Sequence, residues 1–341
     1  MTSQLSFTAI GISSSVWATL AVSGLVASCP SLCRALANEA PGSTHVAVWK
    51  DDKKAAFLLM FDDGEPTHLA TVIPELKKRG FIGTFYLNPN ANWFVPMKGR
   101  WEKEATEAGM VFGNHTMNHC GAKTATEAEA EIAPCNEYVL GLYPDLKRPR
   151  LISFCRPGGS PWTVSPEEMQ RLLIKYNLIQ RPPPDGRFAG IHLKTAEALI
   201  QVVDGVLATG GVDQLFFHGV GGDWLSQPKE DFVKVLDHLA ANREKLWVTD
   251  PVSVHQYETE RAGATIKVIQ AGATEIRLAL STSADPVFYD APLTLLTQVS
   301  PAWKTCRVDQ SGTSVTVPVV NGAVRYDAKP GSGEIVIRLL P

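Results

Sequence analysis

The chain has 341 residues, of which 45% are hydrophobic and 20% are charged; this composition excludes a disordered protein, a coiled coil and a multi-span membrane protein. Its 32 Lys and Arg residues against 35 Asp and Glu residues give a net charge of −3. Because no long basic run offsets that charge, nucleic acid is not an expected partner. The six cysteines form no pair of CxxC clusters, which argues against a zinc ribbon and leaves disulfides open.

The first residues have the pattern of an export signal. No charged residue precedes Arg34, and residues 7–28 are mostly apolar. An Ala-Leu-Ala sequence ending at Ala37 predicts ordinary signal cleavage, and a lipoprotein anchor at Cys29 is the alternative. The usual Lys or Arg near the start is missing, so a membrane anchor or a misassigned start stays open. We assign residues 1–40 to a signal and linker, and expect a secreted or periplasmic protein with no stable membrane span after cleavage.

Short apolar runs then alternate with amphipathic stretches as far as residue 261. This pattern predicts about seven β-α units and therefore a parallel sheet, in a closed or nearly closed (β/α) barrel over residues 41–261. The predicted strands are 55–61, 83–87, 110–113, 151–155, 178–180, 214–217 and 246–248. The predicted helices are 66–78, 97–108, 125–142, 166–176, 195–208, 229–242 and 252–261. Chemistry is expected at the carboxyl ends of the strands.

Two carboxylates, Asp62 and Asp63, follow the first predicted strand directly. Adjacent carboxylates repel when both are ionised, so such a pair is stabilised where a cation holds one member and the other shares a proton. Taken alone, the sequence Asp-Asp-Gly also fits a helix N-cap or an Asx turn.

Two histidines, His115 and His119, follow the strand at 110–113. Their spacing of four predicts a helical turn with both imidazoles on one face, able to reach one ion. Zinc suits two histidines and one carboxylate with an open position for water. Taken alone, the spacing is as often a coincidence, but Asp63 is expected at the same face of the barrel and strengthens the hypothesis.

Two further strand ends carry candidate residues. Arg156 is expected to pair with a catalytic carboxylate, and Gly158 and Gly159 allow backbone N–H groups to approach an oxyanion. A surface loop with a helix-capping arginine is the alternative. His218 directly follows the strand at 214–217 and fits a general acid, with a buried core histidine as the alternative.

After residue 261 the pattern changes to short alternating strands at 264–270, 275–280, 313–317 and 334–339, separated by turn residues. They predict a small β-sandwich over residues 262–341. With no histidine and few carboxylates, an accessory role is expected for it. Sugar binding by Tyr289 or Trp303 is the alternative.

The ordered motifs Phe-Asp-Asp-Gly, His-x3-His, Arg-Pro-x-Gly and Leu-x-x-His resemble those of the polysaccharide deacetylases, the NodB-homology group of carbohydrate esterase family 4, over residues 55–257. The resemblance implies a distorted (β/α) barrel with a divalent metal, usually zinc, with cobalt or another divalent ion as the alternative. It also implies roles for six residues: Asp63, His115 and His119 as metal ligands, Asp62 as general base, Arg156 as the group that orients it, and His218 as general acid.

The chain departs from the family pattern at two places. The bulky residue expected before the last glycine of the third motif is missing, and Trp162 is the candidate for that groove wall. The family's Asp and Trp group, whose Asp orients the catalytic histidine, has no clear match; Asp185 is the candidate, with a plain turn as the alternative. Trp224, in the loop after His218, is a candidate for stacking on a sugar face, or else a packed aromatic anchor.

These observations predict a secreted, metal-dependent enzyme that removes acetyl groups from an acetylated carbohydrate, an N-acetyl amino sugar polymer or oligomer. An O-acetyl esterase acting on acetylated xylan or a similar glycan is the first alternative, because one site serves amide and ester alike. A non-catalytic glycan-binding protein is the second alternative. That reading predicts a mutated site, whereas every position expected to bind metal or transfer a proton is intact.

Overall fold

The computed structural model describes residues 39–143, 146, 148–182 and 194–340. The predicted signal, with Cys29, and the candidate Asp185 lie outside the described residues. The part of the chain from Glu39 onward forms one compact unit. Within the described ranges, no helix is long and apolar enough to cross a bilayer.

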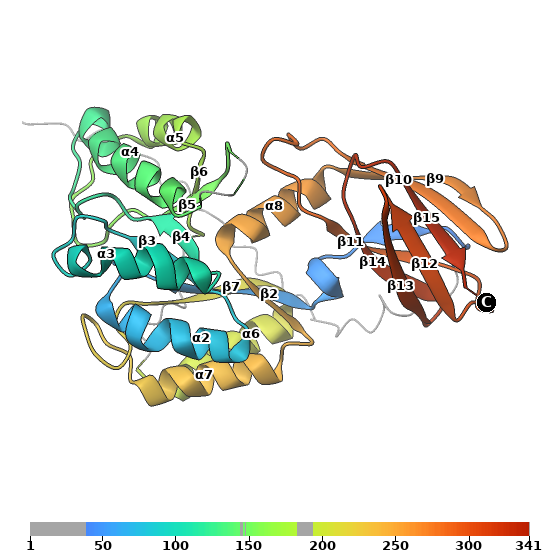
Figure 1. Ribbon diagram of the computed structural model, residues 1–341, viewed down its shortest axis with the longest axis horizontal. Coiled ribbons are helices and arrows are strands. Elements are labelled where there is room, and N and C mark those ends of the chain that lie inside the picture. The colour runs from blue at the N-terminus through green and yellow to red at the C-terminus, as the bar shows by residue number, and fades with distance from the viewer. Residues whose placement is uncertain (1–38, 144–145, 147, 183–193, 341) are drawn as a thin grey trace, which may run out of the picture. The chain divides into compact units, whose positions relative to one another are not determined.

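The first of two sheets is parallel and has seven strands (Figure 1). Their order is β6-β5-β4-β3-β2-β7, and β8 also pairs with β2. Every residue of β2 is buried, which is typical of a strand covered on both faces. The strands are β2 (Ala55–Phe61), β3 (Thr84–Leu87), β4 (Val111–Asn114), β5 (Ile152–Phe154), β6 (Leu178–Gln180), β7 (Gly211–Phe217) and β8 (Leu246–Thr249).

The central strand β2 shows how the barrel is distorted. One edge of β2 pairs with β7 over its whole length. The other edge of β2 is shared by two strands. There β8 pairs with Ala55 to Leu58, while β3 pairs only with Met60 and Phe61. The strands β6 and β7 end the path without pairing with each other in the described part of the chain. The barrel is therefore incomplete, which confirms the expected distorted (β/α) fold.

Helices follow the strands in the predicted alternation, and several begin at polar caps. Thr124, Ser165, Thr195 and Asp250 each accept a backbone N–H from the first turn of the helix that follows. The helices are α2 (Ile73–Arg79), α3 (Lys98–Arg100), α4 (Ala125–Gly141), α5 (Pro166–Lys175), α6 (Ala196–Thr209), α7 (Lys229–Ala241) and α8 (Pro251–Ala262). A π-helical turn over His68–Val72 precedes α2.

Aromatic side chains fill the interface between the parallel sheet and its helices. The Phe61 ring stacks on Phe85 at 4.8 Å and on Phe217 at 5.6 Å between ring centroids. Phe232 of α7 meets Phe217 edge-on at 5.3 Å. These contacts join β2, β3 and β7 immediately beneath the strand ends that carry the candidate residues, so they fix where those residues emerge.

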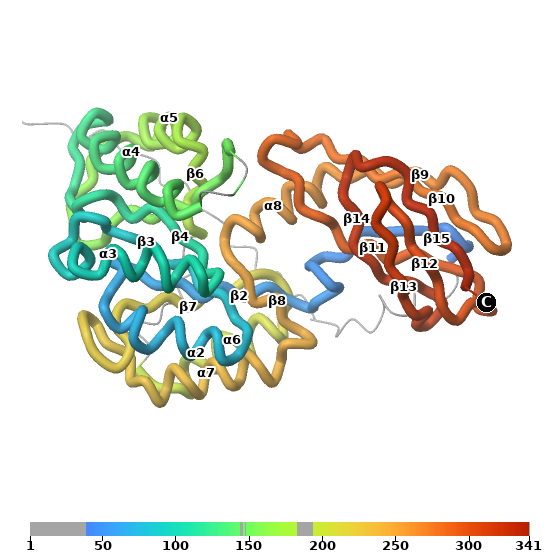
Figure 2. The backbone as a smooth tube through the Cα atoms, viewed as in Figure 1, coloured from blue at the N-terminus to red at the C-terminus, as the bar shows by residue number. Residues whose placement is uncertain are grey.

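The second sheet is antiparallel, with the order β1-β11-β14-β13-β12-β15-β10-β9, and it confirms an all-β C-terminal region. The short strand β1 (Thr44–Val46) was not predicted; it pairs with β11, with Thr44 opposite Thr297. Figure 2 shows this early segment among the late strands. The other strands are β9 (Ala264–Ala271), β10 (Glu275–Thr282), β11 (Leu293–Gln298), β12 (Thr305–Gln310), β13 (Thr313–Val320), β14 (Ala323–Ala328) and β15 (Glu334–Leu339).

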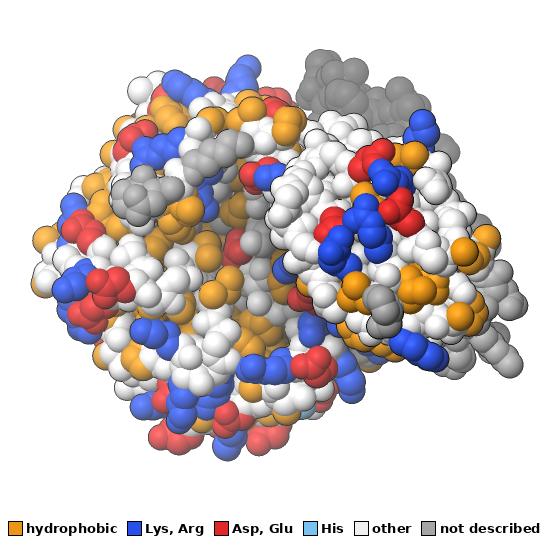
Figure 3. Space-filling view, turned by 45° about the vertical axis from the view of Figure 1, so that its right-hand side comes forward, with side chains coloured by type: hydrophobic (Ala, Val, Ile, Leu, Met, Phe, Trp, Pro, Cys, Tyr) orange, Lys and Arg blue, Asp and Glu red, His pale blue; other side chains and the backbone are white. Residues whose placement is uncertain are grey.

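The antiparallel sheet offers little support for sugar binding. Trp303 is 2% exposed and donates its Nε1 hydrogen to the Ala273 carbonyl, so its proposed stacking role is wrong. Tyr289 contacts His255 of α8 through its hydroxyl group. Acidic and basic side chains are interspersed on the surface in Figure 3. On the antiparallel sheet, Arg277 and Arg338 both pair with Glu275. Arg277 lies on the same strand as Glu275, whereas Arg338 of β15 lies directly opposite Glu275 and neutralises it across the two strands.

Candidate functional site

The ends of the parallel strands surround a pocket of 840 Å³. The sequence-predicted residues that line it are Asp62, Asp63, His115, His119, Arg156, Gly158, Gly159, His218 and Trp224. They come from segments that are far apart in the sequence, from Asp62 to Trp224. The parallel sheet brings them together because all its strands end at the same edge.

Three side chains converge as a metal site requires. Asp63 Oδ1 lies 3.3 Å from His115 Nε2 and 3.4 Å from His119 Nε2. An ion held tetrahedrally at about 2.0–2.1 Å from each ligand atom separates neighbouring ligand atoms by roughly 3.3–3.4 Å. The observed spacing of these atoms therefore fits a zinc-sized ion.

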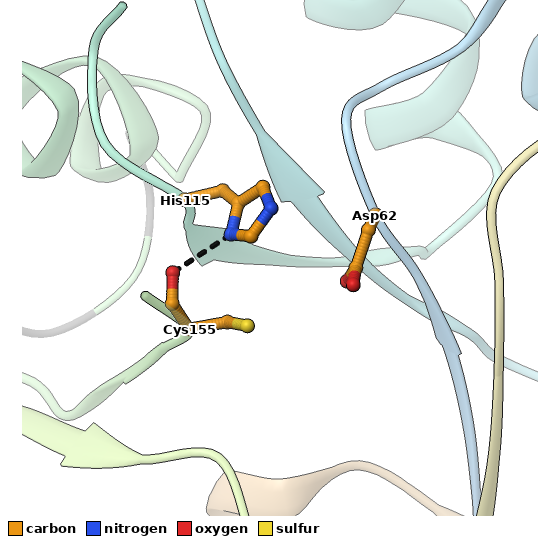
Figure 4. A group of neighbouring side chains, drawn as sticks. All are labelled: Asp62, His115 and Cys155. Atoms are coloured by element: carbon orange, nitrogen blue, oxygen red, sulfur yellow. Dashed lines mark hydrogen bonds between the residues drawn. The ribbon is translucent and has the colours of Figure 1, made fainter. Parts of the chain in front are cut away.

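The proton positions at His115 strengthen this fit. His115 Nδ1 lies 2.7 Å from the Cys155 carbonyl, which only accepts hydrogen bonds, so Nδ1 carries the hydrogen (Figure 4). In the neutral ring the Nε2 atom then carries no hydrogen, and its lone pair faces Asp63 Oδ1. That oxygen is buried and has no hydrogen-bond partner among the described residues. Two acceptors that face each other call for a cation between them, and the residues fit a divalent metal.

A second group of potential ligands, Asp62, His115 and Cys155, lies nearby (Figure 4). It is the poorer metal site for two reasons. Both carboxylate oxygens of Asp62 already accept hydrogen bonds from Arg181, at 2.7 and 3.0 Å. His115 Nδ1 is engaged by the Cys155 carbonyl, as described above.

The two histidines lie in an irregular loop, and the predicted helical turn is wrong. Thr116 and His119 have left-handed φ values of 71° and 57°, which a right-handed helical turn excludes. The rings still approach to 5.4 Å between centroids. Side chains from outside the loop fix its backbone by hydrogen bonds. Asn88 donates to the His115 and Thr116 carbonyls, and Glu131 of α4 accepts the backbone N–H of Asn118.

The guanidinium that pairs with Asp62 belongs to Arg181, and the expectation that Arg156 would take this place is wrong. Burial raises the pKa of the Asp62 carboxyl, but Arg181, His115 and His218 together hold it below its ordinary value. Arg181 follows the end of β6 and lies over the rings of Tyr86 and Phe216, at 5.1 and 4.8 Å. The Arg156 side chain is exposed on the pocket wall.

His218 stands across the pocket from the His115 loop. Its Nε2 lies 3.6 Å from Asp63 Oδ2, and its Nδ1 is buried without a partner among the described residues. Two backbone contacts position it: Asp62 N–H donates to the Phe217 carbonyl at 2.9 Å, and His68 Nε2 donates to the His218 carbonyl at 2.7 Å. His68 is fully buried and was not singled out from the sequence.

The tryptophan that forms a wall of the pocket is Trp93, and the prediction of Trp162 for this place is wrong. Trp162 does not belong to the lining of this pocket; it packs partly buried against the barrel core and bridges to Ala122. Trp93 lines the pocket instead and donates its Nε1 hydrogen to the Asp63 carbonyl at 2.9 Å. The sequence carries no periodic signal for Trp93, because it lies in an irregular loop.

The ends of the parallel strands thus bring two carboxylates and three imidazoles to one pocket. The polysaccharide deacetylase family model matches residues 50–176. The matched segment carries Asp62, Asp63, His115 and His119, in agreement with the resemblance drawn from the motifs.

Similar proteins were found among curated sequences and solved structures. A gellan lyase from a Bacillus species is 23% identical over 333 residues, covering 87% of this chain but only 13% of that protein. A carbohydrate esterase family 4 pseudoenzyme from Bacillus anthracis is 17% identical, with a TM-score of 0.44 over 60% of this chain and 66% of its own. A family 4 carbohydrate esterase from Streptomyces lividans, solved with acetate, is 16% identical, with a TM-score of 0.42 over 57% and 92%.

Proposed function

We propose that this chain is a metal-dependent deacetylase that hydrolyses acetyl groups on a carbohydrate, with an N-acetyl amino sugar polymer or oligomer as substrate. The observation that carries the proposal is the convergence of Asp63, His115 and His119 beside an arginine-paired Asp62 and opposite His218. Metal ligands, a base and an acid are thereby arranged around one pocket. In this proposal residues 41–261 form the catalytic domain and residues 262–341 an accessory domain.

The metal ligands are Asp63, His115 and His119. When bound there, a divalent ion, with Zn²⁺ expected and Co²⁺ as the alternative, supplies Lewis acidity that polarises the acetyl carbonyl and acidifies water. The ligand set of two imidazoles and one carboxylate suits zinc. The Cys155 carbonyl contributes by keeping His115 Nε2 free of a hydrogen.

Asp62 is the proposed general base. It takes a proton from the attacking water, which then adds to the carbonyl carbon. The pairing with Arg181 keeps the carboxylate ionised and fixes its plane, because both of its oxygens accept from one guanidinium nitrogen. A carboxylate whose position is fixed accepts the proton without first having to be ordered.

His218 is the proposed general acid on the other side of the reacting carbon. It donates a proton to the sugar nitrogen as the bond between carbon and nitrogen breaks, so acetate and a free amine leave. Gly158 and Gly159 are the proposed oxyanion donors and substrate contacts. A Cβ atom added at either glycine would meet nothing within 4 Å, so a substrate has open access to this backbone.

Acetate release from a substrate panel tests this proposal. The full chain, supplied with zinc, is incubated with N-acetyl chitooligosaccharides and with acetylated xylan. We expect acetate from the chitooligosaccharides, and loss of that activity in Asp62→Asn with metal content retained. Release from the ester alone would replace this function with an O-acetyl esterase. Binding of both glycans with no acetate released would indicate a non-catalytic glycan-binding protein.

A further inference from the structure

One part of the pocket wall carries a carboxylate that the proposed reaction does not use. Glu65 is 6% exposed and lines the pocket. Within the described part of the chain, no side chain forms an ion pair with its carboxylate and no group donates a hydrogen bond to it. An unpaired buried carboxylate is costly unless a ligand compensates for the lost hydration.

A second carboxylate belongs to the same wall. Asp223 lies in the loop after β7 and lines the pocket together with Glu65. Its position is fixed, because Asp223 Oδ2 accepts the Thr67 N–H at 2.6 Å. Thr67 also holds the loop through its hydroxyl, which accepts the Val220 N–H at 3.1 Å. The two carboxylates are therefore built into the wall.

Two indole rings line the same pocket. Trp224 is 64% exposed and Trp93 is 40% exposed, although large aromatic side chains are normally buried. Trp93 is oriented by its hydrogen bond to the Asp63 carbonyl, and the Trp224 carbonyl accepts the Gly219 N–H at 2.8 Å. Exposed indole faces bind sugar rings and attract organic cations.

We propose that Glu65, Asp223, Trp93 and Trp224 form a subsite for a cationic amino sugar next to the unit that loses its acetyl group. An ammonium group compensates for the two carboxylates, and the sugar ring covers the indoles. A bare metal ion fits less well, because indole rings offer no ligand atom. The proposal rests on the proposed function, since deacetylation of one unit creates the ammonium that the subsite recognises. The enzyme then prefers chains that already carry a free amine beside the acetylated unit.

Calorimetric titration of the full chain tests the subsite without relying on activity. The probes are the glucosamine trimer and the neutral N-acetylglucosamine trimer, at low and high salt. We expect the wild type to bind the cationic trimer about tenfold more tightly than the neutral one, and Glu65→Gln and Asp223→Asn each to reduce that ratio several-fold. Glu107→Gln, an exposed glutamate outside the pocket lining, is the matched control and keeps the wild-type ratio.

The outcomes separate the subsite from the proposed function. A ratio that is the same in the wild type, Glu65→Gln and Asp223→Asn overturns the subsite, whether or not acetate is released. A ratio that depends on both carboxylates supports it, even in a protein that releases no acetate, in which case only the proposed function fails. Asp223 is exposed, so Asp223→Asn tests the proposal even where Glu65→Gln impairs folding.

Discussion

At the scale of single residues, the most informative difference between sequence and structure concerns an arginine. The motif pattern assigned the partner of Asp62 to Arg156, and the structure assigns it to Arg181. A usable signal was present: Arg181 is the first residue after the predicted strand at 178–180, just as Asp62 and His218 follow theirs. Strand-end position therefore predicts a site residue even where no motif marks it.

Substitutions of Arg181 and Arg156 are expected to have different effects on acetate release and on its pH profile. Arg181→Gln is expected to lower kcat/KM for acetate release about 100-fold, because the proposed base loses its oriented, charge-assisted partner. Without the guanidinium the pKa of Asp62 rises, so the acid limb of the pH profile moves to higher pH. Steady-state kinetics between pH 5 and 9 measure both effects.

Arg156→Gln is the matched comparison, because it removes a guanidinium from the wall of the same pocket. We expect a smaller loss and an acid limb at the wild-type pH. A shift of the acid limb in Arg156→Gln, together with a wild-type profile in Arg181→Gln, would restore the original assignment.

At the scale of elements, the strands and helices of the barrel were predictable and the loop geometry was not. The strand predicted at 55–61 has the bounds of β2, and the helix predicted at 125–142 differs from α4 by one residue. Hydrophobic periodicity and polar caps carry that information locally. The loop from His115 to His119 is instead shaped by side chains from other elements, including Asn88 and Glu131, so its local spacing misled the prediction.

The helix α4 supports the metal ligands through Glu131. Its carboxylate accepts both the backbone and the side-chain N–H of Asn118, at 2.9 and 2.8 Å, beside His119. Glu131→Ala is expected to weaken zinc binding about 10-fold, the lower end of the range for residues that orient metal ligands. Competition with a chromophoric chelator measures the affinity. Glu137→Ala, at an exposed position of α4, is the control; equal affinities in the two variants would show that Glu131 does not orient the ligands.

The helix α8 carries a carboxylate that makes stability depend on pH. Burial is the main cause that raises the pKa of Glu260 to about 7, and Asp290 adds to it. The folded state then binds more protons than the unfolded state between pH 4.5 and 7, so this group lowers stability as pH rises through that window. Above pH 7 its effect is constant.

Removing this charge is therefore expected to stabilise the protein only at higher pH. Glu260→Gln raises the free energy of unfolding at pH 8 by about 2–3 kcal/mol and has little effect at pH 4. Urea unfolding at the two pH values measures the difference. A gain that is equal at both values would show that packing, and not the charge, is responsible.

At the scale of the whole molecule, the first described strand, β1, belongs to the antiparallel sheet, and the next strand, β2, belongs to the parallel sheet. The strand β1 pairs with β11 across 253 residues of sequence, through contacts such as Thr44 with Thr297. A strand of three residues has no periodicity to detect, and its partner is far away in sequence, so the sequence did not predict it. Trp49 follows β1, is 2% exposed and lies close to Trp247 of β8 and Arg261 of α8.

This arrangement predicts that Trp49 contributes to global stability. Trp49→Ala is expected to destabilise the protein by about 3–5 kcal/mol, because it leaves a large cavity. Trp224→Ala, which removes an exposed indole, is expected to change stability by less than about 0.5 kcal/mol. Urea unfolding followed by circular dichroism measures both variants. A similar small effect at both positions would show that Trp49 does not anchor this part of the chain.

The central claim is that Asp63, His115 and His119 hold one divalent ion that carbohydrate deacetylation requires. Acetate release from an N-acetyl chitooligosaccharide tests it most directly, with protein stripped by a chelator and then titrated with zinc. The account predicts no release from the stripped protein and full recovery at one equivalent of zinc per chain. Release that persists after the metal is removed, with no response to added zinc, would contradict it.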